Sequence, residues 1–349
     1  MANWSDIPQD IARKIATEHV ESLEDFETLS EVSSKWRDAT KGVNFCPSKN
    51  TQHPWLMLVD PPTSSYHRLY SLSKRMFRKF DLPQLEDDDH HRFFSSKGWL
   101  IAVSRRNRNI TLFDPVSGKV IKPPIAMIFD ITQRLAIWKP GEHKWTVIPT
   151  TNNWIFDVCF FKGELYAIDH LGKIIAFGVE VAKQPPGTVV DLIDQGVLLR
   201  QSTGQLYLVE AESTLLVIHR YVHLAGDDDE PDYPKIDEAH YRTTKFEIYE
   251  LDVDNWKAKE VEGVGKRAIF VGLGSSTFSV DASLDKCGCK ANCIYFTDDN
   301  IEAYCSSKLG GGSDMGVYRL DEKIIDRFYK GPSQFCFITP PIWVERPHY

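Results

Sequence analysis

From Trp55 onward the chain is a succession of short apolar runs, rich in β-branched and aromatic residues and separated by turn signals. Trp99 to Val103 is one such run, and the figure Gly-x-Leu-Tyr recurs at Gly163 and Gly204. Almost no helical period interrupts these runs, so the pattern predicts an all-β domain. A domain with this many strands must hide its sheet edges, and closing the sheets into a ring does so.

A weak internal repeat favours such a ring. A strand of the form Gly-x-Leu-Tyr is followed by another strand, a turn and a closing strand. This order resembles the blades of kelch-type propellers, of about 50 residues each. We therefore predict a kelch-like β-propeller of about six blades over residues 46–349, with an irregular pair of β-sandwich sheets as the alternative. The expected closing segments are Met76 to Pro83, Lys119 to Pro124, Lys144 to Pro149, Trp256 to Glu262 and Ile324 to Lys330.

Residues 1–45 have a different pattern and predict a small all-α domain of three helices. Ile7, Ile11 and Ile15 repeat every four residues, which gives one apolar stripe along a helix. The expected N-caps are Asp6, with Pro8 in the first turn, then Ser22, then Ser33 or Ser34. Three helices of this length make a very small core, and such a unit usually needs a partner surface.

Charge limits the possible partners. The chain has 41 Lys and Arg against 49 Asp and Glu, a net charge of −8, which argues against a general nucleic-acid binder. A helix-turn-helix DNA reader is an alternative for residues 1–42, but acidic residues outnumber basic ones there and would repel phosphate. The acidic runs Glu86 to Asp89 and Asp227 to Glu230 suggest solvated loops.

The compartment is expected to be the cytosol or the nucleus. The N-terminus lacks the basic start and apolar run of a secretory signal, and no segment approaches the roughly 18 apolar residues of a membrane span. The 7 cysteines are odd in number and scattered, which fits reduced thiols better than a disulfide framework.

A search for catalytic motifs finds none with a complete set of groups, so we predict no cofactor, no metal and no catalytic residue. Cys287-x-Cys289-x-x-x-Cys293 lacks the usual zinc spacing and a clear fourth ligand. A propeller enzyme or a carbohydrate binder remains a less favoured alternative, and the enzyme would need carboxylates that converge at the mouth of the ring. Its candidates are Asp169, Asp298 and Asp299, at turns where propellers often keep structural aspartates.

Two sets of motifs resemble a known family. Trp4-x-x-Ile7-Pro8-x-Asp10-Ile11, followed by Val32-x-x-Lys35-Trp36-Arg37, resembles the F-box, although Ile7 and Ser34 stand where that motif more often has Leu and Cys. Asn292 to Asp299, Asp314 to Tyr318 and Thr339 to Val344 together resemble the C-terminal domain of KIB-type plant F-box proteins. The two resemblances cover nearly the whole chain in the family's order.

The resemblance implies a substrate-recognition subunit of an SCF-type (Skp–cullin–F-box) ubiquitin ligase. The F-box would bind the Skp linker protein and through it a cullin, while the β-domain would hold an unidentified protein target. An F-box scaffold that acts without ubiquitination is an alternative. The expected partner-binding residues are Trp4, Ile7, Pro8, Ile11, Ile15, Val32 and Trp36. We assign Phe26 and Leu29 to the internal core, which is also the alternative for Trp36, and we expect loops 85–92 and 223–242 to contact the target.

Overall fold

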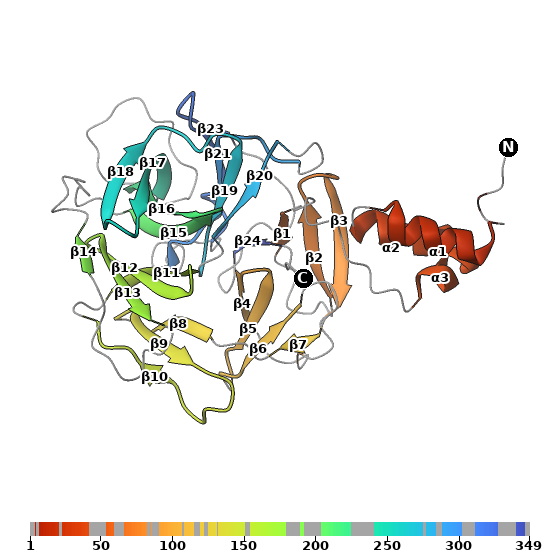
Figure 1. Ribbon diagram of the computed structural model, residues 1–349, viewed down its shortest axis with the longest axis horizontal. Helices are drawn as coiled ribbons and strands as arrows, with labels where there is room; N and C mark the ends of the chain where they lie inside the picture. Colours follow the sequence, from red (N-terminus) through yellow and green to blue (C-terminus); the bar gives the residue numbers. More distant parts are fainter. Residues whose placement is uncertain are drawn as a thin grey trace.

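The computed structural model shows a small helical unit beside a ring of β-sheets (Figure 1). It describes residues 4, 7–20, 23–41, 54–58, 66–81, 85, 91–106, 108–114, 119–121, 125–130, 132–150, 154–178, 189–191, 204–224, 241–274, 277–283, 288–301, 311–326 and 340–345. The expected boundary between residues 45 and 46 falls outside these residues, as do both acidic runs. No helix among the described residues is long and apolar enough to cross a membrane.

The three predicted helices are present. They are α1 (Gln9–Glu18), α2 (Leu23–Val32) and α3 (Ser34–Thr40). The Ser33 cap is confirmed, because its side chain accepts a hydrogen bond from the backbone N–H of Trp36.

The expected start of the first helix is wrong. The N-cap of α1 is Pro8, which makes no side-chain capping bond, whereas Asp6 was the expected cap and lies outside the described residues. Pro8 has an extended ψ of 142°, so it stands before the first turn and not within it. Its carbonyl still accepts the N–H of Ala12 at 2.9 Å, which is the first bond of the helix.

In the part of the chain that the structure describes, six sheets form the ring, so the predicted propeller of about six blades is confirmed. We number these sheets as blades 1 to 6 along the chain. Blade 1 is β24-β1-β2-β3, blade 2 is β4-β5-β6-β7, blade 3 is β8-β9-β10, blade 4 is β11-β12-β13-β14, blade 5 is β15-β16-β17-β18, and blade 6 is β20-β19-β21-β22-β23.

Most blades follow one antiparallel plan. Strands of blades 1 to 3 are β1 (Trp55–Leu58), β2 (Tyr66–Ser71), β3 (Met76–Asp81), β4 (His91–Ser96), β5 (Trp99–Ser104), β6 (Ile110–Phe113), β7 (Val120–Ile121), β8 (Ile125–Phe129), β9 (Arg134–Trp138) and β10 (Thr146–Val147). Those of blades 4 and 5 are β11 (Ile155–Phe161), β12 (Glu164–Asp169), β13 (Lys173–Gly178), β14 (Val189–Asp191), β15 (Gln205–Ala211), β16 (Thr214–Leu224), β17 (Tyr241–Asp252) and β18 (Lys257–Val261). Blade 6 has β19 (Arg267–Val271), β20 (Phe278–Asp281), β21 (Cys293–Phe296), β22 (Gly316–Arg319) and β23 (Ile324–Asp326), and β24 is Ile342–Val344. Each expected closing segment contains the outermost strand of its blade.

The C-terminal strand closes the ring. β24 pairs antiparallel with β1, with Trp55 opposite Val344 and Met57 opposite Ile342. All three residues of β24 are fully buried. The last described strand thus becomes the innermost strand of the first blade, and its pairing with β1 covers one edge of each strand.

Buried clusters hold neighbouring blades together. Phe270, Val280 and Trp343 belong to the cluster that joins blade 6 to blade 1. Similar clusters join blades 1 and 2, blades 3 and 4, blades 4 and 5, and blades 5 and 6. None of these clusters contains residues of both blade 2 and blade 3.

Candidate functional site

The helical unit has an internal core of its own. Ala12 of α1 and Ala39 of α3 are fully buried, and these small side chains let the two helices approach closely around Trp36. Ile7, Ile15 and Leu29 pack against this core and are partly buried. The expected internal role of Leu29 therefore agrees with its packing.

Trp36 does not lie at the surface. Only 2% of its side chain is exposed, so it belongs to the core of the unit, as the alternative assignment held, and not to the expected docking surface. Its indole Nε1 donates a hydrogen bond to the carbonyl of Trp4 at 2.8 Å. The expectation that the Trp36 side chain itself contacts a partner is therefore corrected, because the side chain is buried and its indole binds the backbone of the exposed Trp4.

Several other expected partner-binding residues do lie at the surface. The exposed fraction is 62% for Trp4, 43% for Ile11 and 45% for Val32, and Pro8 is also exposed. We call Trp4, Pro8, Ile11 and Val32 the exposed apolar set. Ile7 and Ile15 are half-buried and pack against the internal core.

The helical period of α1 explains why one apolar stripe both packs in the internal core and is partly exposed to water. Side chains four residues apart share one face of a helix, so Ile11 and Ile15 form a strip along α1. Ile7 precedes the helix and packs against the same core. Ala12 and Ala16 are buried beside that strip and face the unit's interior. The apolar face of α1 is therefore wider than its own core can cover, and the part around Ile11 is left in contact with water.

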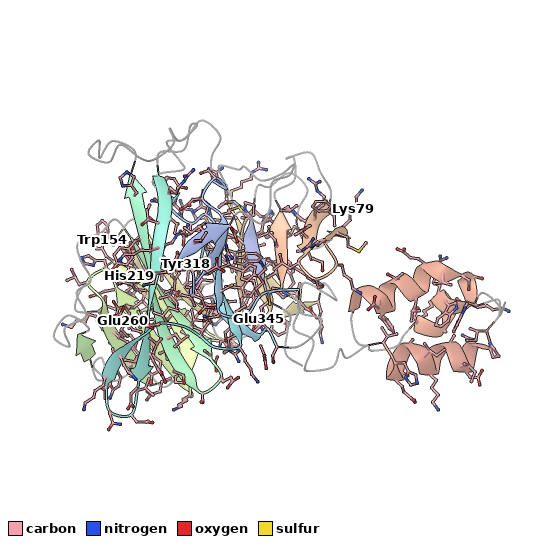
Figure 2. The ribbon with its side chains drawn as sticks, turned by 90° about the horizontal axis from the view of Figure 1, so that it is seen from above. Lys79, Trp154, His219, Glu260, Tyr318 and Glu345 are labelled. Atoms are coloured by element: carbon pink, nitrogen blue, oxygen red, sulfur yellow. The ribbon has the colours of Figure 1, made fainter. Side chains whose placement is uncertain are left out.

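The helical unit touches the ring through α2. The Lys74 Nζ lies 2.8 Å from the Asp25 carboxylate, and Phe26 packs against the cluster that contains Trp55 and Met57 of blade 1. Phe26 therefore contacts the ring, whereas we expected it inside the helical core. Figure 2 shows the ring edge-on, with Lys79 of β3 on the side near the helices and Trp154 and His219 on the far side.

The aspartates considered for a propeller enzyme lie away from solvent. Asp169 is fully buried and accepts hydrogen bonds from the backbone N–H groups of Leu171 and Lys173, at 2.9 and 2.8 Å. Asp298 is also fully buried, accepts the Tyr241 hydroxyl, and accepts the N–H of Gly312 at 2.7 Å. Asp169 thus bonds within its own turn, whereas Asp298 joins distant parts of the chain, with Tyr241 and Gly312 at sequence separations of 57 and 14.

A buried arginine joins blades 5 and 6. Arg220 of β16 is 1% exposed, and its guanidinium lies 2.8 Å from Asp299 and 2.9 Å from Asp314. It also donates to the Thr243 hydroxyl at 2.7 Å and to the Thr297 carbonyl at 2.9 Å. We call Arg220, Asp298, Asp299 and Asp314 the inter-blade network.

Burial dominates the electrostatics of the inter-blade network. It raises the pKa of Asp298 to about 6, with the nearby Asp314 charge adding to the rise. Burial also raises the pKa of Asp299, while Arg220 opposes that rise. The motifs Asn292 to Asp299 and Asp314 to Tyr318, which carry the family resemblance, thus supply structural contacts between blades.

The other candidate ligands are not gathered into a site. Within the described ranges, no group of three or more His, Cys, Asp or Glu residues could hold a metal ion. Cys293 is buried on β21 as a free thiol, Cys289 is half-buried, and Cys287 lies outside the described residues. His219 and His223 lie on the single strand β16.

Comparison with known proteins agrees with this architecture. Residues 123–319 match the sequence model of the KIB1-4 beta-propeller family. The chain belongs to this family. The predicted resemblance to KIB-type plant F-box proteins is thereby confirmed.

Relatives of this KIB-type chain extend over its full length. The F-box protein SKIP23 of Arabidopsis thaliana is 21% identical, over 99% of this chain and 96% of the relative. A second Arabidopsis thaliana F-box protein is 24% identical, over 90% of this chain and 94% of the relative. Among solved structures, the β-propeller domain of Myceliophteria thermophila Cps50 (Swd1) is 11% identical over 81% of this chain and 87% of that one, with a TM-score of 0.35.

Proposed function

We propose that this KIB-type chain is the substrate-recognition subunit of an SCF-type ubiquitin ligase. The helical unit would dock on the Skp linker protein and through it on a cullin, and the propeller would hold a protein target for ubiquitination. The chain itself would supply no catalytic group. It would act by raising the effective concentration of target lysines beside the ubiquitin-conjugating enzyme. The proposal expects the chain in the cytosol or the nucleus.

The exposed apolar set carries this proposal. Trp4, Ile11 and Val32 each expose more than two fifths of their side chains to water, on a unit that projects from the ring (Figure 1). Apolar side chains of this size at the centre of an interface contribute on the order of 2–4 kcal/mol each. The relatives described as F-box proteins also align with the chain through its N-terminal part.

A single charge on the exposed apolar set tests the docking step. Ile11→Asp places a carboxylate on the exposed part of the α1 stripe, where docking would have to desolvate it. We expect the Kd for the purified Skp linker to rise by at least about 30-fold, which corresponds to about 2 kcal/mol. Ile11 is a better site for this test than Ile7, because Ile7 also packs in the core of the unit.

Thr17→Asp is the matched control. Thr17 is exposed on the same helix, two residues after Ile15, so its side chain does not share the apolar stripe. It adds the same charge, and its Kd should stay within about threefold of that of the unchanged chain. Circular dichroism checks that both variants keep their helices. Equal binding by Ile11→Asp and the unchanged chain would refute the assignment of the docking surface.

Ubiquitin transfer needs a separate test. The full chain is assembled with the Skp linker, a cullin and a conjugating enzyme, and added to a cell extract. Proteins whose ubiquitination increases with the unchanged chain, and not with Ile11→Asp, would be targets. Skp binding without any such protein would favour the scaffold alternative.

A further inference from the structure

Among the described residues, blade 3 has fewer strands than any other blade. Its sheet has the order β10-β9-β8, whereas blades 1, 2, 4 and 5 have four strands and blade 6 has five. In Figure 1, β8 is the strand of blade 3 nearest the centre of the ring, and β10 is the outermost. In blade 4 the innermost position belongs to β11. Among the described residues, no strand pairs with the inner edge of β8.

The adjoining chain cannot supply the missing strand. β7 ends at Ile121 and β8 begins at Ile125, so only Lys122, Pro123 and Pro124 lie between them. An inner strand as long as β8 would need 5 residues and a turn at each end. Proline also lacks the N–H that pairing in a sheet requires. The three residues between β7 and β8 are therefore too few to form an inner strand of blade 3.

The hydrogen bonds of β9 show which groups of β8 face this opening. The carbonyl of Leu135 accepts the N–H of Ile148 at 2.9 Å, so the backbone groups of Leu135 point toward β10. Ile137 is two residues after Leu135 on the same strand, so its backbone groups also point toward β10. Ile128 lies opposite Leu135, and Ala126 lies opposite Ile137. In an antiparallel pair, a residue opposite one that points away from the pair also points its N–H and C=O away, so Ala126 and Ile128 direct theirs away from β9. Ala126 and Ile128 thus present two donors and two acceptors to the inner edge.

The side chains of β8 are only partly covered by the rest of the described structure. All five of its residues are half-buried, whereas the residues of β24 in the equivalent blade 1 sheet are fully buried. Ala126 and Ile128 pack against the cluster of blades 3 and 4 that contains Leu135 and Ile155. The alternate residues Ile125, Met127 and Phe129 belong to no buried cluster of the described residues.

We propose that the inner edge of β8 receives an extended segment of a target protein as the missing strand of blade 3. This inference rests on the proposed function, because it assumes that the propeller holds a protein target and describes how the target is held. The segment runs antiparallel to β8, and its main chain pairs with Ala126 and Ile128. It is about five residues long, with apolar side chains at alternate positions facing Leu135 and Ile155, and with no proline at its pairing positions.

A phage-displayed library of random heptapeptides, selected on the full chain, tests this site. Ala126→Pro removes a donor from the inner edge and leaves the β8–β9 bonds intact, because the N–H of Ala126 does not point toward β9. Ala126→Val is the matched control, since it adds similar bulk and keeps the N–H. We expect alternating apolar peptides to be enriched on the unchanged chain and on Ala126→Val, and to bind Ala126→Pro at least tenfold more weakly.

Amide hydrogen exchange gives the second measurement. A peptide from the enriched pool should slow exchange at Ala126 and Ile128 by at least tenfold, and leave Met127, already bonded to β9, unchanged. Equal enrichment on Ala126→Pro would overturn the proposal. So would slow exchange at Ala126 and Ile128 in the free chain, because another segment of the chain would then occupy the edge. Peptide binding without Skp binding would refute the proposed function and leave the β8 site standing.

Discussion

The inter-blade network allows a stability prediction with a defined magnitude. Arg220→Met removes the cation from between Asp299 and Asp314, whose side chains are only 8% and 6% exposed. Removing one partner of a buried ion pair costs about 3–5 kcal/mol, because the remaining charge stays buried without compensation. For a domain of this size, about 2 °C per kcal/mol gives a fall in Tm of roughly 6–10 °C. The assay is thermal unfolding of the full chain, followed by circular dichroism at pH 7.

Arg319→Met is the matched control for Arg220→Met. Arg319 also lies near two carboxylates, at 2.6 Å from Glu322 and 3.0 Å from Asp326, but these partners are 51% and 49% exposed. An exposed pair contributes about 0–1 kcal/mol, so Tm should fall by at most about 2 °C. The triple variant Arg220→Met, Asp299→Asn, Asp314→Asn should recover part of the loss, because the two carboxylates that Arg220 neutralised are then no longer charged. Equal Tm values for Arg220→Met and Arg319→Met would refute the argument from burial.

Two further predictions concern the same region and the ring closure. Burial raises the pKa of Asp298 to about 6 from 3.8, so the folded chain binds a proton more tightly than the unfolded chain, and stability due to this group falls as pH rises from about 4 to 6. The Tm of Asp298→Asn relative to the unchanged chain should therefore rise over this interval, and a constant difference would contradict the prediction. Trp343→Ala should lower the free energy of unfolding by about 3–5 kcal/mol, because Trp343 is fully buried in the cluster that joins blades 6 and 1. Urea unfolding measures this loss. A loss below about 1 kcal/mol would show that the cluster does not hold the ring closed.

The strands could be predicted because their signal is local. The closing segment around Met76 to Pro83 is bounded by turn signals, and its strand β3 lies within it. The Ser33 cap is equally local, since it acts on an N–H three residues ahead. The exposure of Ile11 also follows from its sequence period, because the α1 stripe is wider than a unit of three helices can cover.

Other features depend on contacts between distant residues. Arg220 meets Asp299 and Asp314 at sequence separations of 79 and 94, and nothing near β16 in the sequence indicates that a charge is buried there. Trp36 fits a core and an interface equally well by residue type, and the close approach of Ala12 and Ala39 decides in favour of the core. Pro123 and Pro124 are a signal that could have been used, because they leave no room for an inner strand before β8.

The contact between the helical unit and blade 1 bears on how proximity could serve ubiquitin transfer. The Lys74–Asp25 pair is exposed at 37% and 53%, so it adds about 0–1 kcal/mol and would not hold the unit by itself. Phe26 adds an apolar contact with the cluster around Trp55, and Trp55 lies on β1, the first strand of the ring. A target strand on β8 would therefore be held by the same closed ring that contacts α2. Effective concentration depends on how few orientations the two sites can adopt relative to each other, so the contact between α2 and blade 1 would contribute to it.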